Sequence, residues 1–316
     1  MKLVVSCIST RHSVLKDHWT QSSEKTECPV TVRGSLEKPN VDLGGLVCLL
    51  EIPGGILKTF DLPAAAGMVL TDQGLLITTS SSVHEIDASL EHLRQDKISL
   101  PYFNALHSLS RTQRGYIVAS TGLDLLIEFD LAGNILWTWW ATEHGFDLTP
   151  TGSKRELDKT LDYRTKKFGT LGQTTHVNSV AELSENTILA TLFHQGTVIA
   201  IDRETGHWRT VLDGLDHPHA VRILDQEHFT IADTVHGRAL LVRLDQQDGL
   251  GKIETSVDAH CDWLQDSSYN PELDTWVLVD GQHSRVSLRQ GREGQRQIAS
   301  YDFEAEWRLY EALLLG

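Results

Sequence analysis

Residues 176–212, HVNSVAELSENTILATLFHQGTVIAIDRETGHWRTVL, hold four short apolar segments separated by polar turns. The segment TVIAID (197–202) shows the period of two that is expected of a half-buried β-strand. The turn signal RETG (203–206) separates the last two segments. The stretch therefore predicts a unit of four consecutive strands, and His176 stands at the start of the first.

The same pattern recurs along the chain at intervals of about 40 residues. Repeated units of several strands at this spacing are typical of the blades of a β-propeller. The regular spacing argues against two alternatives, a β-sandwich and a pair of separate β domains. The four further units cover residues 67–90, 106–140, 219–255 and 260–303.

A sixth blade is expected from both ends of the sequence. Residues 2–10 and 45–62 supply three of its strands, and its innermost strand is expected within AEWRLYEALLL (305–315). This arrangement closes the ring and removes the exposed edges that an open sheet would leave. We therefore predict an all-β fold, a single six-bladed propeller domain over residues 1–316. Seven blades are the alternative if residues 11–44 hide further strands. Helical patterns occur only at 154–167 and 304–315.

One turn of the repeat resembles a known group of propellers. The sequence ADTVHGRALLV (232–242) is similar to the turns of six-bladed propellers of the NHL and SMP-30-like kind. The resemblance extends over most of the chain through the strand pattern. It implies an architecture and not a reaction, because one fold can host many functions.

Four histidines occupy the same place in four of the units: His107, His176, His219 and His260. In a propeller the innermost strands surround a central channel, so side chains at their starts can meet around the axis. A second set stands at turns expected on the same face: His84, His194, His236 and His283. His217 lies two residues before His219, and either of them could point inward.

Two long insertions are expected on the same face as these histidines. They cover residues 11–44 and 141–173. Long loops in a compact domain often serve as lids over binding sites. The sequence therefore predicts a covered pocket at the mouth of the channel.

Converging histidines indicate a metal site. Neutral imidazole is the commonest protein ligand of transition metals, and a bound cation gives four like residues a reason to share one channel. Four neutral ligands without a carboxylate favour Fe(II), whereas three histidines with a water favour Zn or Mn. The competing interpretation is that each histidine only forms hydrogen bonds between blades.

Further residues are candidates for catalysis beside the histidines. Asn178 and Asp262 each follow a channel histidine by two residues, which places them on the same side of a strand. Asp233 and Asp280, like Thr121, end second strands near the channel. The second insertion adds Glu143, His144, Asp162, Tyr163, Arg164 and Lys166, of which His144 and Arg164 are the chosen candidates.

The histidine pattern also resembles propeller enzymes of other families. Carotenoid-cleaving oxygenases hold iron with four histidines, and oligogalacturonate lyases have a histidine-rich metal site. The segment HVNSV (176–180) is similar to strand starts of bacterial arylsulfotransferases, which use a channel histidine. SMP-30-like lactonases bind metal mainly through Glu, Asn and Asp, and no aligned acidic ring is visible here.

Composition limits the partners. The net charge is −15 with histidine neutral, which argues against a nucleic-acid or anionic-membrane partner. The four cysteines have no CxxC spacing, and no signal peptide or membrane span is evident, so a cytoplasmic location is expected. The sequence has no P-loop and no GxGxxG after a strand, which argues against a nucleotide cofactor.

Three functions remain open at this point. The first is a metal-dependent enzyme that acts on a small molecule in the channel, as an oxygenase-type oxidoreductase or as a lyase or hydrolase. The second is a propeller without catalysis that binds a ligand or a protein. The third is metal-free acid–base catalysis by a channel histidine, as in sulfuryl transfer or an elimination. The oligomeric state is open as well.

Overall fold

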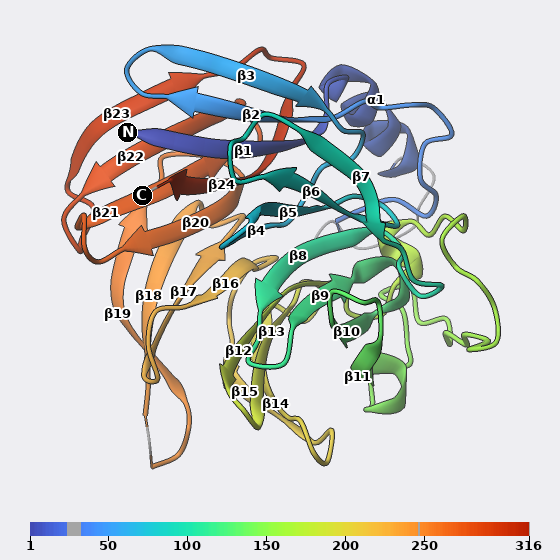
Figure 1. Ribbon diagram of the computed structural model, residues 1–316. Helices are drawn as coiled ribbons and strands as arrows, with labels where there is room; N and C mark the ends of the chain where they lie inside the picture. The colour runs from blue at the N-terminus through green and yellow to red at the C-terminus, as the bar shows by residue number, and fades with distance from the viewer. Residues whose placement is uncertain (24–32, 246, 316) are drawn as a thin grey trace.

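The computed structural model describes residues 1–23, 33–245 and 247–315, and it has the architecture of a propeller (Figure 1). Six four-stranded antiparallel sheets surround a common axis. This confirms the prediction of an all-β fold with six blades. Blade 1 consists, from the axis outward, of β24 (Arg308–Leu315), β1 (Lys2–Ser9), β2 (Leu46–Glu51) and β3 (Gly55–Asp61).

The other blades each use four strands that are consecutive in the sequence. Blade 2 holds β4 (Met68–Thr71), β5 (Gly74–Thr78), β6 (Val83–Asp87) and β7 (Leu93–Ile98). Blade 3 holds β8 (Leu106–Arg111), β9 (Tyr116–Ser120), β10 (Leu125–Phe129) and β11 (Ile135–Trp140). Blade 4 holds β12 (Val177–Ser184), β13 (Thr187–Leu192), β14 (Thr197–Asp202) and β15 (Trp208–Leu212). Blade 5 holds β16 (His219–Ile223), β17 (His228–Asp233), β18 (Arg238–Leu244) and β19 (Gly251–Asp258). Blade 6 holds β20 (Leu264–Asn270), β21 (Thr275–Asp280), β22 (Arg285–Gln290) and β23 (Arg296–Asp302).

The ring is closed within blade 1, as the sequence predicts. Strand β1 lies between β2 and β24 and pairs with both in antiparallel register, so that Val4 faces Leu49 on one side and Leu313 on the other. Strand β1 therefore has no free edge, which protects the protein from edge-to-edge association.

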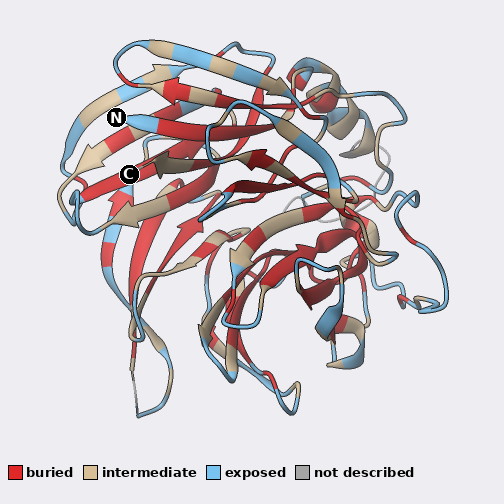
Figure 2. Cartoon of the chain, in the orientation of Figure 1, coloured by how far each residue is buried: buried red, intermediate tan, exposed pale blue. Residues whose placement is uncertain are grey.

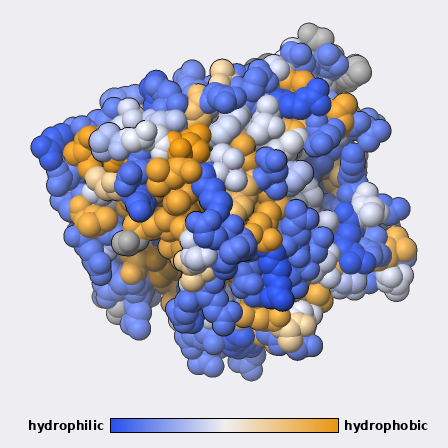
Figure 3. Space-filling view, turned by 45° about the horizontal axis from the view of Figure 1, so that its top comes forward, coloured by the Kyte–Doolittle hydropathy of each residue, from blue (hydrophilic) through white to orange (hydrophobic). Residues whose placement is uncertain are grey.

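Apolar side chains fill the six junctions between neighbouring blades, and each junction holds one cluster of buried residues. The strands are accordingly buried along the middle of the ring and exposed at the loops (Figure 2). The face shown in Figure 3 is mostly hydrophilic, with smaller hydrophobic patches between the polar residues. The propeller is thus held together by burial between blades, which is the dominant favourable term in folding.

A buried ion network adds a polar link between blades 3 and 4. The Glu128 carboxylate is fully buried and lies 2.6 Å from guanidinium nitrogens of both Arg114 and Arg203. It also accepts a hydrogen bond of 2.7 Å from the Thr112 hydroxyl. Arg203 pairs in addition with Glu182. Every carboxylate oxygen of Glu128 is therefore matched, as a buried charge requires.

The helical predictions for two segments were wrong. Residues 308–315 form strand β24, because pairing with β1 satisfies its backbone. Residues 154–167 contain no helix, and side-chain oxygens instead hold their turns, such as Asp158, which accepts from the Thr160 amide at 2.9 Å. The one α-helix in the part of the chain that the structure describes is α1 (His12–Ser23), in the first insertion, and short 3-10 helices cover Thr121–Leu123, Ala141–Glu143 and Thr170–Gly172. The described residues contain no helix with the length and apolar character needed to span a membrane.

Candidate functional site at the mouth of the channel

Three of the four predicted channel histidines lie close together. The ring centroids of His107 and His176 are 5.2 Å apart. His219 lies across the channel mouth, and the Phe193 ring stands between it and His176, at 5.6 and 4.7 Å from the two. We call His107, His176 and His219 the imidazole cluster. Tyr310, 5.5 Å from His107, and Trp263, 6.0 Å from His219, complete the wall.

The three rings share one tautomer. Nδ1 of His107 lies 2.9 Å from the Ala105 carbonyl oxygen, and Nδ1 of His219 lies 2.9 Å from the His217 carbonyl oxygen. Nδ1 of His176 bonds to the side-chain oxygen of Gln173. A carbonyl oxygen can only accept, so the hydrogen-bond network assigns the proton to Nδ1 in each ring. Each Nε2 therefore keeps its lone pair.

Burial keeps the imidazole cluster neutral. Desolvation lowers the pKa of His107 to about 4 and that of His219 to about 3. The pKa of His176 lies well below its usual value, because of burial first and of the neighbouring imidazoles second. At neutral pH the site therefore offers three unprotonated nitrogens that can act as bases, nucleophiles or metal ligands.

Asp124 positions His176, although the sequence analysis did not single it out. Its carboxylate accepts from the backbone amides of Thr174 at 2.8 Å, Thr175 at 2.9 Å and His176 at 2.8 Å. His176 itself has a left-handed backbone with φ of +48°, which these bonds hold in place. Arg155 of the second insertion pairs with the same carboxylate. The sequence did contain a hint of this role, because Asp124 stands at a turn after the second strand of its blade, as Asp233 and Asp280 do in theirs.

Asp233 and Asp280 brace turns in blades 5 and 6. Asp233 accepts from the Asp216 amide at 2.8 Å, from His236 at 2.9 Å and from Arg238 at 2.7 Å. Asp280 accepts from the amide of His283 at 3.0 Å and from its ring at 2.8 Å. Both carboxylates therefore stabilise the turns in which they lie.

Other candidates lie away from the imidazole cluster. The His260 side chain is 67% exposed and lies 3.1 Å from Asp258, so the prediction that it joins the channel was wrong. The reason is that β20 begins only at Leu264, and Trp263 takes the corresponding place. Asp262 is exposed next to it. His144 stacks on Trp139 at 5.1 Å beside the outer strand β11, and the partly exposed Arg164 pairs with Asp162 at 2.5 Å.

Of the second set of histidines (His84, His194, His236 and His283), His194 lies beside the imidazole cluster, as does the separate candidate His217. His194 lies 6.0 Å from His176 and bonds to the Thr170 carbonyl oxygen at 3.0 Å. His217 packs at 4.2 Å against Phe193, so it too belongs to the mouth. The remaining members are set apart: His84 is buried against Thr79, and the side chains of His236 and His283 are 47% and 57% exposed.

Two spaces lie near the imidazole cluster: the larger one reaches it through Phe193, and the smaller one is lined by His219 itself. The mouth cavity has a volume of about 620 Å³, within the range of small-molecule sites, and is open to solvent. Its wall includes Arg33, Pro150, Phe193, His194, Asp216 and His217. A second pocket of about 30 Å³, large enough for a water, lies deeper in the channel. Its lining includes Asn178, His219, Arg222, Asp266, Tyr310 and Glu311.

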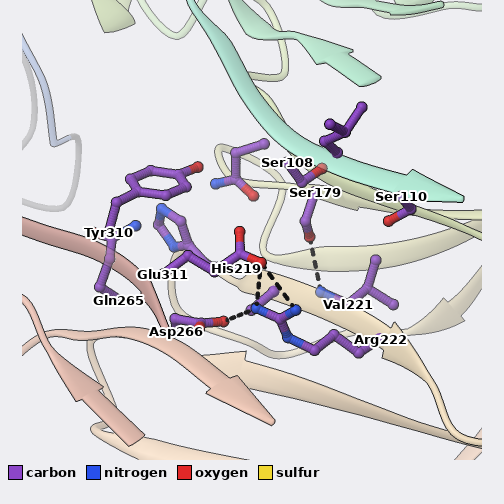
Figure 4. A pocket seen from close by; sticks show the side chains of 13 residues that line it. Ser108, Ser110, Ser179, His219, Val221, Arg222, Gln265, Asp266, Tyr310 and Glu311 are labelled. Atoms are coloured by element: carbon purple, nitrogen blue, oxygen red, sulfur yellow. Dashed lines mark hydrogen bonds and ion pairs between the residues drawn. The ribbon is translucent and has the colours of Figure 1, made fainter. Parts of the chain in front are cut away.

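The deeper pocket contains a charged triad (Figure 4). Arg222 lies 2.5 Å from Asp266 and 3.1 Å from Glu311. Burial raises the pKa of Glu311 to about 7, against the opposing effect of Arg222. Asn178 accepts from the Thr191 hydroxyl at 2.6 Å, while its buried Nδ2 has no hydrogen-bond partner in the described part of the protein. The pocket lining thus includes one buried amide donor that no described residue pairs.

The two insertions meet beside this mouth. The Leu171 amide donates to the Ser35 carbonyl oxygen at 3.0 Å, and the Lys167 ammonium lies 3.0 Å from the Asn40 side-chain oxygen. Helix α1 and the second insertion lie on the same side of the propeller, at the right of Figure 1. Trp19 of α1 covers the guanidinium of Arg308 at 5.6 Å.

The predicted metal site was also compared with the geometry. Among residues 1–23, 33–245 and 247–315, no group of three or more His, Cys, Asp or Glu side chains is arranged to hold a metal ion. The iron centre stays a prediction, with His107, His176 and His219 as the histidines that share the channel.

Comparisons with known proteins identify the fold. No protein family and no curated protein matches the sequence. A protein of unknown function from Bacteroides caccae has a similar structure, with a TM-score of 0.59, 11% identity, and coverage of 84% of this chain and 93% of that chain. A chain in a nidogen–laminin complex has a TM-score of 0.56 and 10% identity over 99% of this chain and 97% of its own. Virginiamycin B lyase from Staphylococcus aureus has a TM-score of 0.50 and 9% identity over 85% of this chain and 83% of its own.

At these identities the similarity shows the fold alone. The similar structures include an enzyme, the lyase, and a chain from the nidogen–laminin complex. The fold therefore does not choose between catalysis and binding, and function has to be argued from the site.

Proposed function

We propose that the protein is an enzyme that acts on a small molecule bound at the mouth of the channel and reaching into it, with a neutral channel histidine as general base or nucleophile. The observation that carries this proposal is the shared tautomer of the imidazole cluster. Each Nδ1 is anchored on an oxygen, and each Nε2 keeps its lone pair in a buried, neutral ring. A base must be unprotonated at the working pH, and these rings are.

His219 is the residue we assign as the base. Its Nδ1 has two oxygen partners, the His217 carbonyl at 2.9 Å and the Thr234 hydroxyl at 2.8 Å, so its ring orientation is the most closely determined. When Nε2 takes a proton from the substrate, the same two oxygens still accept from Nδ1, while burial disfavours the imidazolium and so drives the proton onward. The proton then passes to the leaving group or the product, which restores the neutral ring. The proximity of the other imidazoles opposes a second protonation.

A metal-dependent enzyme is the second candidate. Histidine that binds a metal through Nε2 usually donates its Nδ1–H to an oxygen, which is the tautomer of this cluster. The described side chains are not arranged to hold a metal ion, so His107, His176 and His219 would have to move together before Fe(II), Zn or Mn could bind and polarise an oxygen or activate a water.

Two measurements test the proposal. Nitrogen NMR on protein with labelled histidine reports tautomer and protonation directly, and His219→Asn identifies one signal. We expect an Nδ1-protonated neutral ring from pH 7 down to pH 5. A ring that titrates near pH 6.5, or that carries its proton on Nε2, contradicts the assignment.

The second measurement is activity against a panel of esters, sulfate and phosphate esters and elimination substrates, with and without a chelator. His219→Asn should lose about 10²–10⁴-fold, the usual contribution of a general base. The exposed His207 provides the matched control, His207→Asn, which should keep its activity. One equivalent of a transition metal after purification without chelator, with activity that the chelator abolishes, overturns the metal-free form in favour of the second candidate.

A further inference from the structure

Helix α1 is attached to the segment that leads into β24. The His12 amide donates to the Glu306 carbonyl oxygen at 2.9 Å. The Glu306 carboxylate accepts from the Ser13 amide at 3.2 Å and from the Ser13 hydroxyl at 2.8 Å. Within the helix His12 and Leu15 are buried, and the other described side chains are partly or fully exposed. Helix α1 thus lies beside blade 1, outside the ring of strands, and its first turn joins it to the strand that closes the ring (Figure 1).

The imidazole of His12 is buried in this attachment without a hydrogen bond. His12 is 1% exposed, and neither ring nitrogen has a hydrogen-bond partner in the part of the chain that the structure describes. The Ala305 carbonyl oxygen, near the ring, tends to raise the pKa of His12, but its position does not meet hydrogen-bond geometry. Buried polar atoms are nearly always paired, so this unpaired ring disfavours the attached helix. Water would pair both nitrogens if the helix moved away.

Arg308 lies in the same interface, covered by Trp19 of the helix. It is 3% exposed, and its Nε also lacks a partner among the described residues. The guanidinium lies 5.6 Å from the centre of the Trp19 ring and 5.4 Å from that of Trp263. Burial lowers the pKa of Arg308 to about 10, against the opposing effect of Asp280, so the guanidinium is charged at neutral pH. A proton on His12 would therefore add a second positive charge to an interface with little water, which is unfavourable.

The charged groups that act on His12 come from α1, from β24 and from the turn before β24. Arg308 and Lys16 oppose its protonation and Glu306 favours it, but burial is the largest effect, and together they lower the pKa of His12 to about 4. The two Ser13 donors lower the pKa of Glu306, so this carboxylate is ionised at pH 5. A histidine in water titrates near pH 6.5. His12 therefore binds a proton more readily when the helix is released than when it is attached.

We propose that α1 is a pH-sensitive cover, which lies on Arg308 at neutral pH and is released when His12 takes up a proton. Release removes the Trp19 ring from the guanidinium and brings water to a group that also contacts Trp263. Trp263 lies 6.0 Å from His219 in the wall of the channel, so solvent access to the imidazole cluster increases with acidity. The inference is independent of the proposed function, because the attachment involves no residue assigned to catalysis.

The sign and the size of the effect follow from the linkage between proton binding and release. The attached form is favoured above pH 6.5, where His12 is neutral in both forms, and it loses this advantage as the pH falls. With a pKa of about 4 in the attached form and about 6.5 in the released form, the equilibrium constant for release should rise about 30-fold between pH 7.5 and pH 5.

Hydrogen exchange of the full chain tests the proposal. It is read by mass spectrometry at pH 7.5 and pH 5 and corrected for the intrinsic exchange rate at each pH. The amides of residues 16–22 should show the rise in opening of about 30-fold, while those of β1 stay protected at both pH values. A rise of less than about threefold in the helix overturns the proposal. An equal rise in β1 means global unfolding and overturns it as well.

Variants identify the group that titrates. His12→Phe replaces the imidazole by a ring that binds no proton, so its opening should change less than about threefold between the two pH values. His18→Gln removes the other histidine of the same helix and should keep the rise of the wild type. A wild-type rise in His12→Phe, or loss of the rise in His18→Gln, refutes the assignment.

A further variant tests the attachment without altering His12. Ser13→Ala removes one donor to Glu306, so it should raise the opening at both pH values and keep their ratio. Unchanged opening in Ser13→Ala contradicts the attachment through Glu306.

Discussion

The protein should lose stability below pH 6.5, because the histidines of the imidazole cluster bind protons in the unfolded chain but not in the fold. The folded pKa of His219 is lowered to about 3 by burial, whereas the unfolded chain binds the proton near pH 6.5. A group whose pKa is lowered on folding stabilises the fold above its unfolded pKa, and this contribution is lost as the pH falls. Each such histidine costs about 1.4 kcal/mol per pH unit below 6.5, which gives about 2 kcal/mol between pH 7 and pH 5.

The pH dependence of the unfolding free energy is the sum over all titratable groups of the site. Burial lowers the pKa of His107 to about 4, so His107 and His219 together should cost about 4 kcal/mol between pH 7 and pH 5, and the lowered pKa of His176 adds to the loss. Glu311 opposes this loss, because its folded pKa is raised to about 7 and its protonated form is favoured in the fold. Its contribution over the same interval is a gain of about 2 kcal/mol, which leaves a net loss of about 2 kcal/mol from His107, His219 and Glu311, to which His176 adds.

Urea unfolding at pH 7 and pH 5 measures this linkage. The loss of unfolding free energy between the two pH values should be about 2 kcal/mol smaller in His219→Asn than in the wild type. The exposed His207 supplies the control, and His207→Asn should follow the wild type. If His219→Asn also follows the wild type, His219 takes up its proton in the folded state near pH 6.5, and the argument for a neutral buried cluster fails.

Three further predictions concern stability. Asp124→Asn leaves Arg155, 8% exposed, without its carboxylate and should lower the unfolding free energy by about 3–5 kcal/mol in urea; an unchanged value contradicts the assigned role. Arg203→Met leaves the buried Glu128 with Arg114 as its one guanidinium partner among the described residues and should lower the melting temperature by less than Asp124→Asn does, and the double variant with Glu128→Gln should recover a part of the loss. Leu309→Ala, at a fully buried position of β24, should cost about 2–5 kcal/mol, and Leu57→Ala, at a position 50% exposed on β3, should cost far less. Equal losses at these two positions would refute the importance of ring closure.

The architecture could be read from the sequence because each blade repeats a local pattern. The alternation in β14 and β18 and the turns between strands need no knowledge of distant residues. Even the closure followed from local reasoning, since a blade with three strands at one end of the sequence needs a fourth. The sequence did not predict helix α1. Its buried side chains are those of His12 and Leu15, and two such residues are too few to give a clear helical pattern of apolar positions.

The residues of the candidate site were harder to predict from local sequence patterns. Aligning His260 with the other histidines relied on residue type, while the strand it was meant to open starts four residues later, at Leu264. Asp124 and Arg308 are positioned by contacts between segments that are distant in the sequence. No local spacing marks an aspartate that holds the backbone of Thr174–His176, or an arginine enclosed by Trp19 and Trp263.

The place of β24 in the ring also decides when the site comes into existence. Strand β24 carries Arg308, Tyr310 and Glu311, which form part of the channel and its surroundings. The ribosome makes this strand after all the other blades, and domains generally fold as they emerge. A nascent chain that has completed blades 2 to 6 still lacks β24, the innermost strand of blade 1. Its channel is therefore open along one side. The inner wall of the pocket therefore forms only after β24 has been made and has paired with β1, so a chain that stops before residue 308 should lack the complete pocket.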